Sequence, residues 1–72
     1  MPSSSTLCQI WQVIEQIQAQ MILKLSDSQL IQRIMEQLKS TLTLNPSELN
    51  AAQNYIRLKV PLIRDLAETR LA

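Results

Sequence analysis

Few side chains in this 72-residue sequence could carry chemistry. Histidine is absent and there is one cysteine, Cys8. A serine or cysteine nucleophile therefore lacks the imidazole that usually activates it, and Cys8 has no partner for a disulfide within the chain. Zinc sites built from cysteine and histidine are excluded for the same reason. We expect no enzymatic activity, no cofactor and no metal site, and we interpret Cys8 as a thiol without a catalytic role.

Positive charge gathers near the end of the sequence. The basic residues there are Arg57, Lys59, Arg64 and Arg70. On a helix Arg57 and Arg64 share a face, but Asp65 and Glu68 dilute the charge, and the net charge of the sequence is only +1. Nucleic-acid-binding domains usually carry a strongly basic face. A nucleic-acid partner is therefore not favoured, and a small helical DNA-binding regulator is the alternative hypothesis.

The composition favours helices. Glycine and phenylalanine are absent, and Trp11 and Tyr55 are the only aromatic residues. An all-β domain would need glycine in its tight turns and aromatic or β-branched residues in its strands. No apolar run approaches the ~20 residues that span a bilayer, and the N-terminus lacks the basic and apolar segments of a signal peptide. We expect a helical, cytoplasmic protein that does not bind membranes.

Residues 1–5 are rich in serine and proline and are expected to form a flexible tail, with residues 6–72 as a single helical domain. Thr6 and Gln9 have the spacing of a capping box, so a first helix is predicted from Thr6 to about Leu25. Its apolar face consists of Leu7, Ile10, Trp11, Ile14, Ile17, Met21, Ile22 and Leu25. The opposite face carries Gln9, Gln12, Gln16 and Gln20. These glutamines face either solvent or a partner.

Ser26 and Gln29 form a second capping-box pattern, which predicts a helix over residues 27–41. Because little room remains before Ser26, the first helix must fray early or turn a sharp corner. Asn45, Pro46 and Glu48 are each favoured at a helix start, at the N-cap, N1 and N3 positions respectively. They predict that the last helix begins at Pro46.

Pro61 lies inside this last helix, and the apolar pattern keeps its phase through the proline. One stripe, at Leu49, Ala52, Ile56, Val60, Ile63, Ala67 and Leu71, stays within a narrow arc, whereas Pro61 falls on the polar side. A proline on the solvent side removes one hydrogen bond and bends a helix without ending it. We therefore predict an all-α, three-helix bundle with a long C-terminal helix kinked at Pro61. The alternative is four short helices with a break near Pro61.

A second apolar stripe runs along the same helix, at Ala51, Tyr55, Leu58, Leu62 and Leu66. A helix that is apolar over most of its circumference is usually buried on both sides. The second stripe, and the overhang of this helix beyond the second helix, both suggest that another chain covers it. The alternative is that the stripe packs inside a compact monomer.

These features predict a non-enzymatic protein–protein interaction module, such as a small adaptor, assembly or regulatory protein. Its partner would be a second copy in a homodimer or a larger protein. The expected anchors are Tyr55, Leu58, Leu62 and Leu66, with Arg57 and Arg64 as rim charges that orient the partner.

Overall fold

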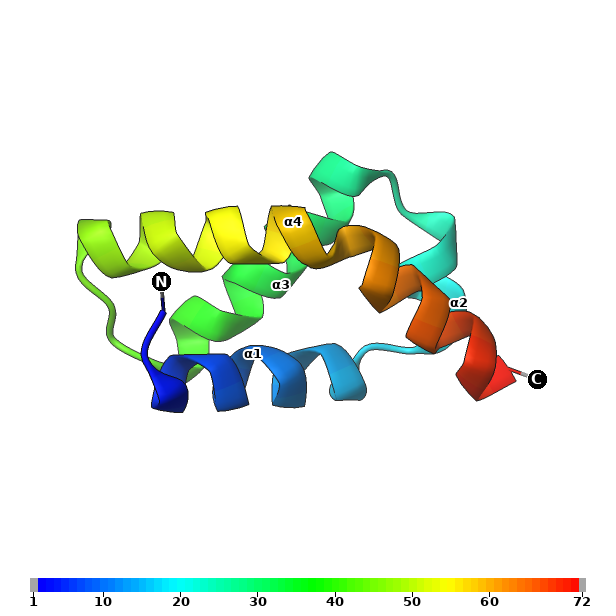
Figure 1. Cartoon of the computed structure of the whole chain (residues 1–72), viewed down its shortest axis with the longest axis horizontal. Helices are drawn as coiled ribbons and strands as arrows, with labels where there is room; N and C mark the ends of the chain where they lie inside the picture. Colours follow the sequence, from blue (N-terminus) through cyan, green and yellow to red (C-terminus); the bar gives the residue numbers. More distant parts are fainter. Residues whose placement is uncertain (1, 72) are drawn as a thin grey trace.

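The computed structural model describes residues 2–71, and these residues form helices without any strand (Figure 1). The helices are α1 (Ser4–Gln16), α2 (Ala19–Lys24), α3 (Asp27–Thr41) and α4 (Pro46–Leu71). The all-α class and the long C-terminal helix are confirmed. There are four helices because the first predicted helix is divided in two, and not because of a break at Pro61. The predictions for Met1 and Ala72 fall outside the described residues.

The start of α1 differs from the predicted one. Ser3 is the N-cap, and its Oγ accepts a hydrogen bond of 3.3 Å from the backbone N–H of Thr6. Thr6, predicted to be the cap, lies inside the helix and is 4% exposed, with its hydroxyl 3.0 Å from that of Ser3. Ser3 supplies the same capping chemistry three residues earlier, so Ser4 and Ser5 of the predicted tail are helical.

The predicted first helix is interrupted at Ile17 and Gln18. Both residues adopt extended backbone conformations, and Ile17 stays buried in the core at 7% exposure. The chain therefore turns its sharp corner before α2 as well as after it. This turn lets α2 pack against the C-terminal half of α4 (Figure 1). The overhang of α4, which suggested a second chain, is thus covered by α2.

The predicted starts of the two longer helices are confirmed. At α3, Ser26 Oγ accepts from the Gln29 N–H at 3.3 Å and Gln29 Oε1 accepts from the Ser26 N–H at 3.2 Å. At α4, Asn45 Oδ1 accepts from the Glu48 N–H at 2.8 Å and Glu48 Oε1 accepts from the Asn45 N–H at 3.1 Å. Each reciprocal pair satisfies donors that the first helical turn leaves free.

Helix α4 continues through Pro61, which is exposed, and Figure 1 shows the helix axis bending near its middle. Its buried residues are Ala52, Ile56, Val60, Ile63 and Ala67, all members of the predicted core stripe. Leu49 is partly buried, whereas Leu71 in the last turn is 51% exposed. The phase of the apolar residues therefore identified the buried face of α4.

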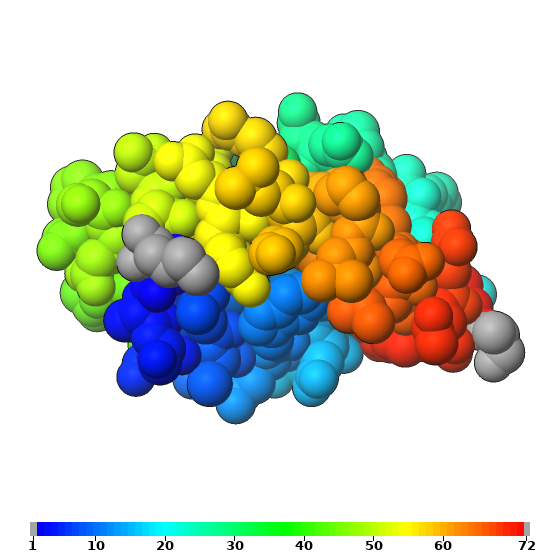
Figure 2. All heavy atoms as spheres, viewed as in Figure 1, coloured from blue at the N-terminus to red at the C-terminus, as the bar shows by residue number. Residues whose placement is uncertain are grey.

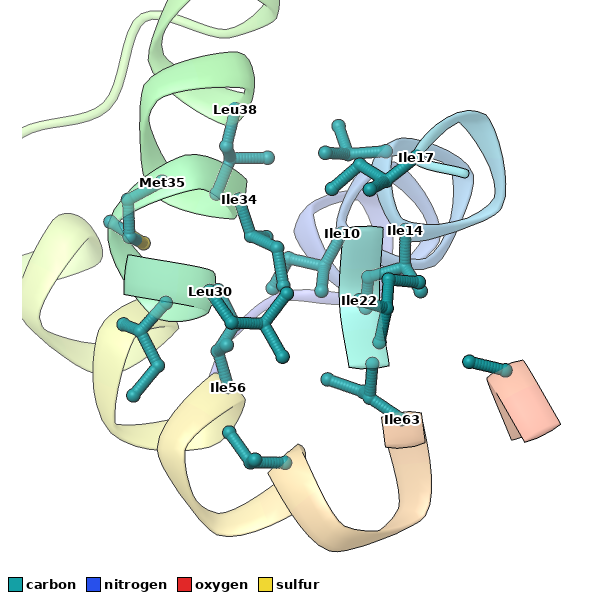
Figure 3. Packing of buried hydrophobic residues seen from close by; sticks show 14 of the residues in the cluster. Ile10, Ile14, Ile17, Ile22, Leu30, Ile34, Met35, Leu38, Ile56 and Ile63 are labelled. Carbon is teal, nitrogen blue, oxygen red and sulfur yellow. The ribbon is translucent and has the colours of Figure 1, made fainter. Parts of the chain in front are cut away.

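The core lies where the four helices meet (Figure 3). Its largest fully buried side chains are Ile10, Ile22, Leu30, Ile34, Leu38, Ile56 and Ile63. They are branched aliphatic residues from every helix, so each helix contributes to a single hydrophobic cluster. Trp11 packs against the edge of this cluster. This agrees with the prediction that Trp11 lies on the apolar face of the first helix.

Replacing Ile56 by alanine tests this assignment of faces on α4. Ile56 is 0% exposed and Leu58, two residues away, is 78% exposed. Ile56→Ala leaves a cavity in the core and should lower the free energy of unfolding by about 3 kcal/mol. Leu71→Ala, the control at an exposed leucine in the last turn of the same helix, should change it by no more than about 0.5 kcal/mol. Urea unfolding followed by circular dichroism measures both, and similar losses in the two variants would contradict the assignment.

Candidate protein-interaction surface

Three leucines of α4 are exposed on one side of the helix. Leu58 is 78% exposed, and Leu62 and Leu66 are 44% exposed each. They are spaced by four residues, so they form one continuous row, which we call the leucine stripe. Residues 58–66 of α4 are coloured from gold to orange in Figure 2. Large apolar side chains in a row are unusual on the surface of a monomer and often mark a binding surface.

Tyr55, the fourth predicted anchor, is partly buried and belongs largely to the fold. Its hydroxyl accepts a hydrogen bond of 3.1 Å from Trp11 Nε1, and the two rings meet edge to face with centroids 6.5 Å apart. The ammonium of Lys59 lies 5.8 Å from the centre of the Tyr55 ring. Tyr55 therefore ties α1 to α4 beside the leucine stripe and offers a partner only part of its ring.

A shallow groove of about 400 Å³ continues the surface from Leu58 toward the start of α4. Its lining residues are Pro2, Ser47, Asn50, Ala51, Asn54, Tyr55 and Leu58. None of them is charged, and Ala51 and Pro2 add apolar area next to Leu58. The groove and the leucine stripe together form an uncharged surface along one side of α4.

Arg64, predicted as a rim charge, is held inside the fold. Its Nη1 donates to the Ile22 carbonyl at 2.7 Å and its Nη2 to the Leu25 carbonyl at 2.9 Å. The same Nη2 forms an ion pair of 2.7 Å with Asp27. Arg64 thus caps the C-terminal end of α2 and joins it to the start of α3.

Arg70 has the equivalent role at the end of α1. Its Nη2 donates to the carbonyls of Ile17 at 3.1 Å and Glu15 at 3.4 Å. Arg57, the other predicted rim charge, lines a groove between α3 and α4 with Lys39, Met35 and Gln53. On the helical wheel this groove and the leucine stripe lie on different sides of α4, so neither Arg57 nor Arg64 borders the stripe.

The structure therefore brings together four of the six predicted partner-binding residues and separates the two arginines from them. Sequence reasoning missed the capping role of Arg64 and Arg70. A signal for it was present, because a chain without glycine lacks the residue that most often ends a helix. Carbonyls at the ends of α1 and α2 then need donors from elsewhere.

Two other charged residues do border the stripe. Lys59 and Asp65 precede and follow Leu62 by three residues each, on opposite sides of the row. Among residues 2–71 the single ion pair joins Arg64 to Asp27, so neither Lys59 nor Asp65 is paired within the described chain. The apolar row is thus flanked by a positive charge on one side and a negative charge on the other.

Comparisons with protein-family models, with curated proteins and with solved structures gave no match to this chain. Within residues 2–71, no helix combines the length and the apolar character that a membrane span requires. The same residues contain no group of three or more cysteine and acidic side chains placed to hold a metal ion.

Removing the donors of Arg64 should destabilise the fold without touching the leucine stripe. Arg64→Met keeps most of the side-chain volume but leaves the Ile22 and Leu25 carbonyls without their guanidinium donor, which should cost about 2 kcal/mol of unfolding free energy. Asp27→Asn, the control, removes the exposed ion pair and the acidic charge in the first turn of α3, and should cost less than about 1 kcal/mol. Thermal and urea unfolding measure both, and an Arg64→Met loss no larger than that of Asp27→Asn would contradict the capping role.

Proposed function

We propose that this protein is a non-enzymatic interaction module that forms a homodimer through the leucine stripe. The observation that carries the proposal is the exposure of Leu58, Leu62 and Leu66 in one row on a helix whose other apolar stripe is already buried. The core is complete without them, since residues from every helix fill it. The leucines are therefore not needed for the monomer's own core.

A second copy is the occupant that the chemistry of this surface favours. A two-fold dimer places the same patch of both copies against each other, so the patch must be complementary to itself. Leucine side chains pack well against leucine, and the flanks carry one charge of each sign, Lys59 and Asp65. A surface with charges of one sign would instead repel its own copy.

The size of the surface predicts a reversible dimer. The surface consists of three exposed leucines and one shallow groove, whereas obligate dimers usually bury more than the roughly 800 Å² per partner of a standard interface. We therefore expect dissociation in the micromolar range. Such a module would act by occupancy, as a small adaptor, assembly or regulatory protein whose helical surface is covered or free according to concentration.

The DNA-binding alternative has less support in this arrangement. Of the four basic residues of α4, Arg64 and Arg70 donate to backbone carbonyls of α1 and α2. Lys59 lies over the Tyr55 ring. Among the described residues, Arg57 and Lys59 are the basic residues of α4 that donate to no backbone carbonyl, and they lie on different sides of the helix. Two separated charges are too few for the charge that phosphate binding requires.

Placing a charge in the centre of the stripe tests the proposal. Leu62→Glu should dissociate the dimer, weakening self-association by at least about tenfold, because two carboxylates would be buried against leucine. Leu71→Glu is the matched control: Leu71 is 51% exposed, close to the 44% of Leu62, but lies on the other side of α4. This variant should dimerise like the wild type.

Sedimentation velocity over a series of concentrations measures association, and circular dichroism verifies that both variants remain folded. A wild type that sediments as a monomer at every concentration up to the millimolar range would overturn the proposal. So would a Leu62→Glu variant that is folded and dimerises as strongly as the wild type.

A further inference from the structure

We infer that the two copies cross with their α4 helices pointing in the same general direction, so that Lys59 of each copy pairs with the partner's Asp65. This inference rests on the proposed homodimer and specifies its geometry. It is carried by two features of the described surface, namely the four-residue spacing of the leucine stripe and the positions of the two charges that flank Leu62.

The spacing limits how two such helices can pack. Residues four apart on a helix form a ridge inclined by about 26° to the helix axis. Leu58, Leu62 and Leu66 form one ridge, and a two-fold axis through Leu62 can run either along this ridge or across it.

Lys59 and Asp65 distinguish these two possibilities. On a helix with 100° per residue, Lys59 lies to one side of the ridge and Asp65 to the other, at equal distances along the axis from Leu62. A two-fold axis along the ridge places the Lys59 side of one copy's ridge against the Asp65 side of the partner's ridge. Lys59 of one copy then lies beside the partner's Asp65, and the symmetry creates this pair twice.

A two-fold axis across the ridge has the opposite effect. Each side of the ridge then faces the same side of the partner, so that Lys59 meets the partner's Lys59 and Asp65 meets the partner's Asp65. Like charges next to each other disfavour this antiparallel arrangement. The charge pattern therefore selects the arrangement in which the two α4 helices run in the same direction.

The fold leaves both charges available for this pairing. The Lys59 ammonium is kept near the stripe by the ring of Tyr55, whose centre lies 5.8 Å away. Asp65 is exposed, and its backbone carbonyl accepts from the Thr69 hydroxyl while its carboxylate forms no ion pair among residues 2–71. Pro61 lies about 100° around the helix from Leu62, so its ring is not part of the leucine stripe.

Reversing the charges tests the inference by sedimentation. Lys59→Glu should weaken the dimer roughly tenfold, since two attractive pairs become repulsive. Asp65→Lys should weaken it similarly, and the double variant Lys59→Glu/Asp65→Lys should restore most of the wild-type association. Arg57→Glu and Glu68→Lys, which make the same charge changes away from the stripe, should leave association within about twofold of the wild type.

Cross-linking provides a second test that does not depend on charge. In a Cys8→Ser background, Leu58→Cys places a thiol at one end of the stripe. If the two-fold axis runs along the ridge, Leu58 lies beside the partner's Leu58, and mild oxidation should cross-link this single variant to itself. If the axis runs across the ridge, a cross-link should require mixing with a Leu66→Cys variant.

The outcomes separate this inference from the proposal on which it rests. A monomeric wild type would remove the homodimer and the crossing geometry together. A dimer that Leu62→Glu disrupts but Lys59→Glu leaves unchanged, or that cross-links only between Leu58→Cys and Leu66→Cys, would keep the homodimer and overturn the crossing geometry alone.

Discussion

The structure depends on two guanidinium groups that reach back from α4 to the ends of other helices. Arg64 binds the terminal carbonyls of α2, and Arg70 binds those of α1. Helices commonly end at a glycine in the left-handed conformation, which allows the chain to satisfy its own last carbonyls. This chain has no glycine, and no described residue has a positive φ angle. Donors from a distant segment replace the missing local motif and fix the corner between α1, α2 and α3.

This distinction between local and distant causes explains how much of the fold could be predicted from the sequence. The starts of α3 and α4 depend on side chains within three residues of each other, so Ser26 with Gln29 and Asn45 with Glu48 identified them. The buried face of α4 followed from periodicity alone. The interruption at Ile17 did not, because apolar residues continue in helical phase up to Leu25 and the partner that stabilises the corner is Arg70, far along the sequence.

The candidate surface could be predicted to a similar extent. The leucine stripe follows from the phase of α4, since one of its two apolar faces had to be the core. The roles of the charged residues of α4 could not be predicted from this phase. Arg57 and Arg64 share a helical face, but only the positions of α2 and α3 show that Arg64 is engaged by carbonyls. The same arrangement leaves Lys59 and Asp65 beside the stripe, where neither had been expected to matter.

The capping by α4 also has a consequence for the order in which the protein is built. The ends of α1 and α2 are synthesised first, but the arginines that satisfy them are added about forty to fifty residues later. On an elongating chain, the corner around Ile17 and Leu25 therefore has no complete set of hydrogen-bond partners until Arg70 has left the ribosome. The N-terminal segments can form helical turns on their own, but they acquire their final arrangement only through the last turns of α4.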